Sequence, residues 1–248
     1  MEVQLLAHTQ LSSAFRDRIK NELAQLTSEP SDGQVVALTA IRNCYSSTYP
    51  SEIFMKEYKK YFGKKASDGK SGTDAERLFR QIIHSGHLST MEHLSFTFSI
   101  QNVSRALLAQ LTRHRVGFSF SVESQRYTRL GSNDKSGGFH YVVPESVKRA
   151  GGDTLAVFES TMKQLQENYD TLREQGIPPE DSRSLLPNAT VTNIVMTANL
   201  RALLDFYKKR RHGHGAQWEI AELAEALRNC VVEAETWTEQ FFKFKNTK

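Results

Sequence analysis

The sequence is poor in cysteine and contains no long apolar run. Only two of its 248 residues are cysteine, Cys44 and Cys230. This excludes the disulfide framework of a small secreted domain and favours a protein of the reducing cytoplasm. No apolar stretch approaches the roughly 18 residues that a membrane-spanning helix needs, so we expect no membrane partner. The first residues lack a basic segment followed by a long apolar stretch, so we expect no signal peptide.

Common cofactor and metal motifs are missing too. No Gly-x-Gly-x-x-Gly loop follows a predicted strand, so we expect no Rossmann unit, and any dinucleotide would bind in another way. His84, His87 and His93 lie close together, but they lack the i, i+4 pair around a glutamate that a helical zinc site uses. No cysteine lies near them. We therefore expect no metal, and hydrogen-bonded structural histidines are the simpler interpretation.

The charge balance is mildly basic. The chain has 32 Lys and Arg residues against 28 Asp and Glu residues, a net charge of +4. Such an excess fits an anionic small substrate as well as a nucleic acid, so it does not decide between them. The hydrophobic content of 39% is ordinary for a soluble globular protein. Since no repeat or long linker interrupts the chain, we expect residues 1–248 to form a single domain.

The hydrophobic pattern predicts an α+β fold. Alternating or β-branched segments predict strands at residues 3–7, 93–100, 139–143 and 189–197. Apolar steps of three and four, with caps, predict helices at 13–26, 35–44, 51–62, 74–84, 103–112, 155–172, 180–186, 199–208 and 216–233. Because strands and helices do not alternate regularly, we expect a mixed or antiparallel central sheet with helices packed around it. The polar segment 63–72 predicts a surface loop.

Residues 113–127 form the most unusual stretch of the chain. They combine three arginines, a histidine, three serines and a glutamate with Phe118, Phe120 and Tyr127. Arginine is rarely buried without a partner, so this is not a core segment. Guanidinium groups bind phosphate and aromatic faces accept rings, which predicts a site for a planar anionic ligand. The simpler alternative is a basic helix end that complements the helix dipole.

The order of residues in this stretch resembles the signature of the flavin-dependent thymidylate synthases. Arg113-His114-Arg115 is followed by eight residues and then by Ser124, with Arg126-Tyr127 after it. Four further pieces are similar to that family and stand in its order, at residues 87–93, 183–187, 199–201 and 216–220. The likeness covers at least residues 35–220.

The resemblance implies an enzyme that converts dUMP to dTMP. The carbon comes from 5,10-methylenetetrahydrofolate, which leaves as tetrahydrofolate, and FAD reduced by NADPH supplies the hydride. The resemblance also implies a cytoplasmic homotetramer whose sites are shared between subunits. Adjacent helical residues point about 100° apart. If sites are shared between subunits, Arg113, His114 and Arg115 can line different walls of a site or contribute to sites of different subunits.

The resemblance assigns roles to individual residues. Arg211 is the catalytic residue, because its charge beside the uracil carbonyl would stabilise the activated ring. The substrate-binding residues are Gln110, Leu111, Thr112, Arg113, Glu123, Ser124, Gln125, Arg126, Arg183 and Arg211. The cofactor-binding residues are His87, Ser89, Glu92, Arg113, His114, Arg115, Glu123, Asn199, Leu200, Arg201 and Asp205.

The chain departs from the family pattern at several positions. Ser89 stands where threonine is common, and Asp205 stands where asparagine is common. Val122 occupies a position that often holds Glu or Gln, and the neighbouring Glu123 could take over its role. The catalytic arginine is Arg211 when counted back from Ala216. Counting forward from Asn199 gives Arg210 instead, because the chain is one residue longer here.

Two other classes of function remain open at this point. The basic residues 208–215 are typical of a nucleic-acid-binding protein, although a solvated helix end explains them as well. The histidines at 84–93 leave open a metal hydrolase. Cys230 is expected in the core, and we find no support for Cys44 as a nucleophile, which would need a lowered pKa and a defined site.

Overall fold

The structure, a computed structural model, describes residues 1–244. Within them, four strands form one antiparallel sheet in the order β1-β2-β4-β3. The strands are β1 (Glu2–His8), β2 (Ser95–Ser104), β4 (Val191–Asn199) and β3 (Phe118–Val122). Side chains of a strand alternate between its two faces, and Phe96, Phe98 and Ile100 of β2 are buried on one of them. The expected α+β fold with an antiparallel sheet is confirmed.

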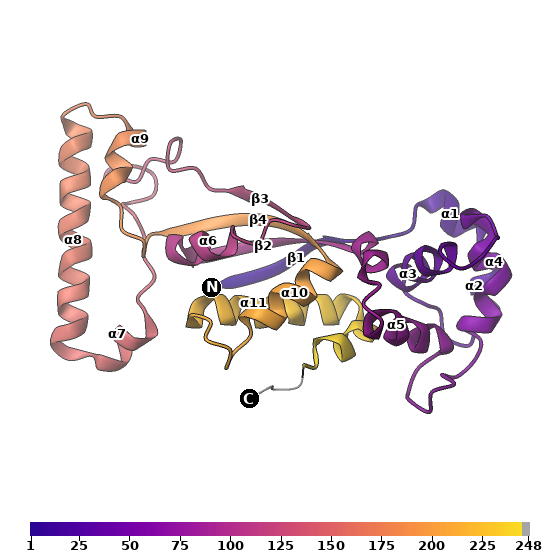
Figure 1. Cartoon of the computed structure of the whole chain (residues 1–248). Helices are drawn as coiled ribbons and strands as arrows, with labels where there is room; N and C mark the ends of the chain where they lie inside the picture. The colour runs from indigo at the N-terminus through magenta and orange to yellow at the C-terminus, as the bar shows by residue number, and fades with distance from the viewer. Residues whose placement is uncertain (245–248) are drawn as a thin grey trace.

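The buried face of the sheet is covered by two helices near the C-terminus (Figure 1). These are α10 (Leu200–Arg210) and α11 (Trp218–Ala234), followed by the 3₁₀ helix η3 (Thr236–Phe242). The inner face of α11 is apolar, with Ile220, Leu223, Leu227 and Val231 buried. Since α10 starts where β4 ends, its first residues lie at the end of an inner strand of the sheet.

The remaining helices gather at the two ends of the sheet (Figure 1). One end holds α1 (Ser13–Arg18), α2 (Lys20–Leu23), α3 (Asp32–Asn43), α4 (Pro50–Tyr61), α5 (Asp74–His84) and the 3₁₀ helix η1 (Leu88–His93). The other end holds α7 (Glu145–Ala150), α8 (Gly152–Glu174), α9 (Pro179–Ser182) and the 3₁₀ helix η2 (Arg183–Leu185). The short helix α6 (Arg105–Leu111) follows β2 directly and packs against β2 and α11. The helix α8 stands apart from the sheet. No described helix has the length and apolarity required to cross a bilayer.

Several expectations about the elements were wrong or incomplete. The helix expected at 180–186 is the short helix α9 followed by η2, and residues 103–104, expected in a helix, belong to β2. Residues 139–143 are not a strand: Tyr141 forms only an isolated bridge with Thr190, and the Phe139 N–H donates to the Gln166 side chain instead (2.7 Å). The helix expected at 13–26 is split, because Ile19 adopts φ −101° and ψ 7° between α1 and α2. The strand β3 was not predicted, since the charged residues around it obscured its alternating pattern.

Candidate active site

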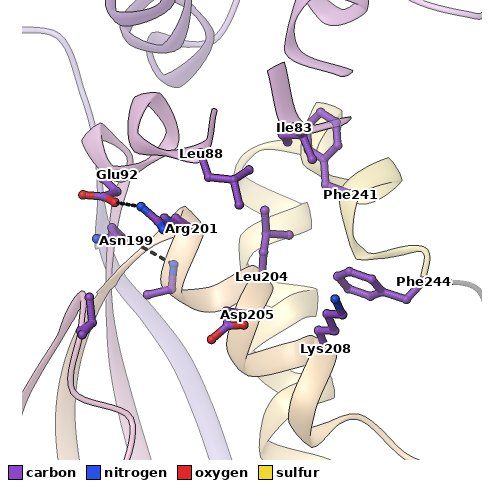
Figure 2. A pocket seen from close by; sticks show the side chains of 12 residues that line it. Ile83, Leu88, Glu92, Asn199, Arg201, Leu204, Asp205, Lys208, Phe241 and Phe244 are labelled. Atoms are coloured by element: carbon purple, nitrogen blue, oxygen red, sulfur yellow. Dashed lines mark hydrogen bonds and ion pairs between the residues drawn. The ribbon is translucent and has the colours of Figure 1, made fainter. Parts of the chain in front are cut away.

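Four of the residues predicted to contact a cofactor line one cavity of about 510 Å³. They are Glu92 from η1, Asn199 at the end of β4, and Arg201 and Asp205 from α10 (Figure 2). The other lining residues are Ile83, Leu88, Val116, Ala202, Leu204, Lys208, Phe241 and Phe244. The cavity therefore has one wall of charged and polar groups and another of apolar side chains.

Asn199 holds two walls of this cavity together. Its Oδ1 accepts a hydrogen bond from the Ala202 N–H (2.9 Å) and so caps α10. Its own N–H donates to the carbonyl of Gly117 (3.1 Å), which brings the turn after Arg115 against the start of α10. Arg201 and Glu92 form an ion pair across the cavity rim. Segments 87–93, 113–117 and 199–205 thus meet at one place.

The glycine in that turn is required by both its conformation and its surroundings. Gly117 has φ +77°, a region that L-residues other than glycine avoid. A Cβ atom at this position would lie 2.7 Å from Asn199 Nδ2 and 2.8 Å from Ala202 Cβ. The close approach of Gly117 to α10 therefore depends on the missing side chain.

His114 points inward while its two arginine neighbours point to solvent. Its ring packs edge-on against Phe206, with ring centres 4.9 Å apart, and its Nε2 accepts a hydrogen bond from Arg210 Nε (3.1 Å). Burial and the positive charge of Arg210 lower the pKa of His114, so the neutral imidazole is favoured. Arg113 and Arg115 are exposed, as expected for adjacent residues that face different surroundings.

The two consecutive arginines at the end of α10 occupy different environments. Arg211 is buried, with 8% of its surface exposed. Its NH1 donates to the Lys208 carbonyl (2.6 Å), and its guanidinium lies 5.0 Å from the centre of the Phe244 ring. Arg210 is only half-buried and reaches His114 instead. Of the two side chains, that of Arg210 therefore lies beside the Arg113-His114-Arg115 motif.

A second group of predicted residues meets near η2. Arg126 Nε is paired with Glu180 Oε2 (3.0 Å), and Arg183 Nε donates to the Glu180 carbonyl (3.0 Å). Ser124 Oγ accepts from the Arg126 N–H (3.3 Å). Ser124, Arg126 and Arg183 therefore form one cationic and hydroxyl-bearing group, although Arg183 comes from a distant segment of the chain.

The remaining predicted residues do not all join these two groups. Gln110 and Thr112 bond to main-chain carbonyls of their own helix, and Leu111 and Leu200 are fully buried. Within residues 1–244, no hydrogen bond or ion pair links the side chains of 110–115 to Ser124, Arg126 or Arg183. Ser89 lines a different, mainly apolar cavity with Phe15, Val35 and Cys44.

His87, Glu123 and Asp205 have partners of their own. His87 Nδ1 lies 2.9 Å from the Tyr45 hydroxyl, and Glu123 Oε2 accepts from Asn193 Nδ2 (2.8 Å). Asp205 pairs with Lys209 (2.6 Å). Gln125, between Ser124 and Arg126, is half-buried.

Sequence reasoning missed several residues at the two groups. Phe241 and Phe244 form much of the apolar wall of the cavity, and Lys208 adds a cation. Arg105 lies near Glu123, as its NH1 donates to the Glu123 carbonyl (3.4 Å). Phe241, Phe244 and Arg105 belong to no local motif. Lys208 belongs to the basic run at 208–215, for which a solvated helix end was the favoured interpretation.

A buried carboxylate anchors α6, the helix that contains Gln110 and Leu111. Glu219 in the first turn of α11 accepts hydrogen bonds from the Ser104 N–H (2.7 Å) and the Ser104 hydroxyl (2.5 Å). The same hydroxyl oxygen caps α6 by accepting from the Leu107 N–H (3.0 Å). Both residues are 3% exposed, so α6 and α11 are joined through a buried polar contact.

Replacing Glu219 with alanine should lower the free energy of unfolding by about 2–4 kcal/mol, because two buried donors of Ser104 lose their acceptor. Chemical denaturation of the two proteins measures the difference. Glu222→Ala is the matched control, since Glu222 lies one turn further along α11 and is exposed. Equal stability of the two variants would contradict the anchoring role.

Comparisons with known proteins agree on one family. The family model described as thymidylate synthase complementing protein matches residues 25–235. A flavin-dependent thymidylate synthase of Geobacter sulfurreducens is 39% identical over 210 residues, which cover 85% of this chain and 82% of the relative. Its counterpart in Haloarcula marismortui is 32% identical over 243 residues, covering 90% and 93% of the two chains.

Solved structures share the fold at lower identity. Thymidylate Synthase X (ThyX) from Helicobacter pylori, crystallised with FAD and dUMP, superimposes with a TM-score of 0.64 at 23% identity and covers 98% of this chain and all of its own. The UMP/dUMP methylase PolB from Streptomyces cacaoi, bound with 5-Br dUMP, gives a TM-score of 0.66 at 21% identity, with 97% and 93% coverage. At these identities the likeness concerns the fold.

Proposed function

The chain belongs to the flavin-dependent thymidylate synthase family, and on this premise we propose that it methylates dUMP to dTMP at the two residue groups described above. The observation that carries this proposal is the meeting of segments 87–93, 113–117 and 199–205 around one cavity. We further propose that residues 1–248 form one domain, since a continuous hydrophobic cluster extends from Ile19 to Phe242.

The cavity beside Asn199 fits FAD. Arg201 and Lys208 offer positive charge to a pyrophosphate, and Leu88, Leu204 and Phe241 offer an apolar wall to a ring. When bound there, FAD supplies the hydride for the pyrimidine. Glu92, Asn199, Arg201 and Asp205 would bind and orient the cofactor in this cavity, together with the motif at 113–115. The other predicted residues, His87, Ser89, Glu123 and Leu200, do not line it.

The group near η2 fits the phosphate of dUMP. Arg126 and Arg183 can donate charged hydrogen bonds to a phosphate, and the Ser124 hydroxyl adds a neutral donor. Gln110, Leu111, Thr112, Arg113, Glu123 and Gln125 complete the substrate-binding set. Phosphate is the part of dUMP that an arginine fork recognises best, so this group sets the orientation of the pyrimidine.

One arginine at the end of α10 is proposed to activate the uracil ring. The spacing to Ala216 favours Arg211, but that guanidinium is buried against Phe244. Arg210 lies beside His114 and is more accessible. We therefore favour Arg210 for this role, in which its positive charge would stabilise the negative charge that develops on the ring. Arg211 would then hold the C-terminal segment.

A homotetramer with shared sites would bring the two residue groups together. In a single chain, the side chains of Gln110 to Arg115 form no hydrogen bond or ion pair with Ser124, Arg126 or Arg183 within the described residues. Apolar side chains on the surface also favour subunit contacts: Val116 is 90% exposed beside the motif, and Val157 on the projecting helix α8 is 66% exposed.

Mixing two inactive variants tests the sharing of sites. Arg113→Ala and Arg126→Ala should each lose most activity, and their coexpression should restore part of it, since some sites then combine intact halves from different subunits. The measurement is dTMP formation by the copurified hybrid. Coexpression of Arg126→Ala with Arg183→Ala is the control, because both changes damage the same group. Restoration in the control, or none in the first pair, would argue against shared sites.

The function itself has a direct test. The purified protein should be yellow, its flavin absorbance should bleach with NADPH, and dUMP with 5,10-methylenetetrahydrofolate should give dTMP and tetrahydrofolate. A colourless protein that binds nucleic acid with a steep salt dependence would contradict the proposal. We also propose a cytoplasmic location, which the free thiols of Cys44 and Cys230 support.

A further inference from the structure

Three segments of main chain converge at the start of α6. The Arg105 N–H donates to the Thr190 carbonyl (3.0 Å), and the Ala106 N–H donates to the Asn188 carbonyl (2.9 Å). These two acceptors follow Arg183 closely in the chain. On the other side, Arg105 NH1 donates to the Glu123 carbonyl (3.4 Å), next to Ser124. Arg105 therefore lies between the segment that carries Arg183 and the segment that carries Ser124 and Arg126.

The guanidinium of Arg105 has few partners for its five donors. Its hydrogen bonds to the Glu123 carbonyl (3.4 Å) and to Thr192 Oγ1 (3.5 Å) are both long. In the part of the chain that the structure describes, no carboxylate pairs with it. The side chain is nevertheless half-buried, so it lacks the full hydration that an unpaired cation at the surface would have.

The guanidinium group of Arg183 adds further positive charge near Arg105. Burial first, and then the positive charge of Arg183, lower the pKa of Arg105, while Glu123 acts in the opposite direction. The Glu123 side chain is itself engaged by Asn193. Two neighbouring guanidinium groups repel each other, and an anion placed between them would relieve the repulsion.

We propose that Arg105 is a further phosphate-binding residue for dUMP, acting beside Ser124, Arg126 and Arg183. The inference rests on the proposed function and adds a residue to its substrate site. A phosphate dianion accepts hydrogen bonds from several guanidinium donors at once. The carboxylate now paired with Arg126 is no obstacle, since Glu180 and Arg126 are 48% and 54% exposed and such surface pairs are weak.

Calorimetric titration of the FAD-loaded enzyme with dUMP and with deoxyuridine tests the proposal. Arg105→Ala should weaken dUMP binding about tenfold to hundredfold, the range for one charged hydrogen bond. Binding of deoxyuridine, which lacks the phosphate, should be unchanged. Arg105→Lys keeps the charge but not the fork, so its loss should be smaller. Arg18→Ala removes an exposed arginine from α1, at the opposite end of the molecule, and controls for net charge (Figure 1).

Each outcome has one meaning. An affinity of Arg105→Ala for dUMP within twofold of the wild type overturns the inference and leaves the proposed function intact. Equal losses for dUMP and deoxyuridine also overturn it, since they indicate a distorted site. A wild-type holoenzyme that binds no dUMP overturns the proposed function together with this inference. If Arg105→Ala fails to fold, Arg105→Gln, which removes the charge but keeps most of the side-chain length, takes its place and is judged by the same criteria.

Discussion

Arg210→Ala lowers the rate of dTMP formation by about a hundredfold to a thousandfold, the effect of removing one group that stabilises developing charge. Its guanidinium donates to His114 and lies beside the Arg113-His114-Arg115 motif, so its loss should act on the chemical step more than on folding. FAD content and the melting temperature should stay close to those of the wild type. Single-turnover measurements of dTMP formation with saturating dUMP give the change in rate.

Arg211→Ala provides the matched comparison, since it removes the same side chain from the next position. Arg211 is 8% exposed and donates to the Lys208 carbonyl, so its replacement should lower the melting temperature while the rate per folded enzyme changes little. The reverse result, a stable but inactive Arg211→Ala with an active Arg210→Ala, would indicate that Arg211 is the catalytic residue.

Gly117→Ala should remove most FAD binding. The positive φ of +77° alone costs an alanine about 1–2 kcal/mol, and the new Cβ would also meet Asn199 and Ala202 at less than 3.0 Å. Neither neighbour can move freely, because Asn199 caps α10. The turn at 115–117 must therefore shift away from the cavity. Flavin absorbance per protein after gel filtration measures the loss, which we expect to exceed tenfold in affinity.

Gly176→Ala separates conformational strain from the clash. Gly176 has a similar φ of +83°, but a Cβ atom there would have no neighbour within 4 Å. This variant should therefore lose some stability and keep its FAD. Normal FAD content in Gly117→Ala, or an equal loss in both variants, would mean that the contact between Gly117 and α10 does not shape the cavity.

The fold was predictable where local signals agree. The helix α5 begins at Asp74 and ends at His84, as expected, because Thr73 caps its first turn and Gly86 follows its last. The prediction of a strand at 139–143 was wrong because a contact with a distant residue outweighed the local pattern. Its apolar alternation is real, but its main-chain pairing is limited to a single bridge between Tyr141 and Thr190, and the Phe139 N–H bonds to Gln166 of α8. Such a long-range partner leaves no trace in a local pattern.

The candidate site was predictable as a set of motifs but not as a geometry. The resemblance named Glu92, Asn199, Arg201 and Asp205, and these residues do share a cavity. It could not separate Arg210 from Arg211, because the extra residue before Ala216 makes counting ambiguous. In the structure α10 continues through Arg210, and Arg211 is its C-cap. The apolar wall of Phe241 and Phe244 arises only from tertiary packing.

The strand β3 acts as a spacer of fixed length. Its five residues separate the turn at 115–117 from the segment that begins at Glu123, and a strand rises about 3.4 Å per residue, or roughly 17 Å in all. Hydride transfer requires reacting atoms about 3–3.5 Å apart. Under the proposed function, most flavin-binding residues precede β3 and the phosphate-binding residues follow it, and the proposed sharing of sites would let a second subunit bring the two ligands together. Specific activity should therefore fall when the enzyme is diluted below the dissociation constant of its subunits, so protein concentration becomes a control on catalysis.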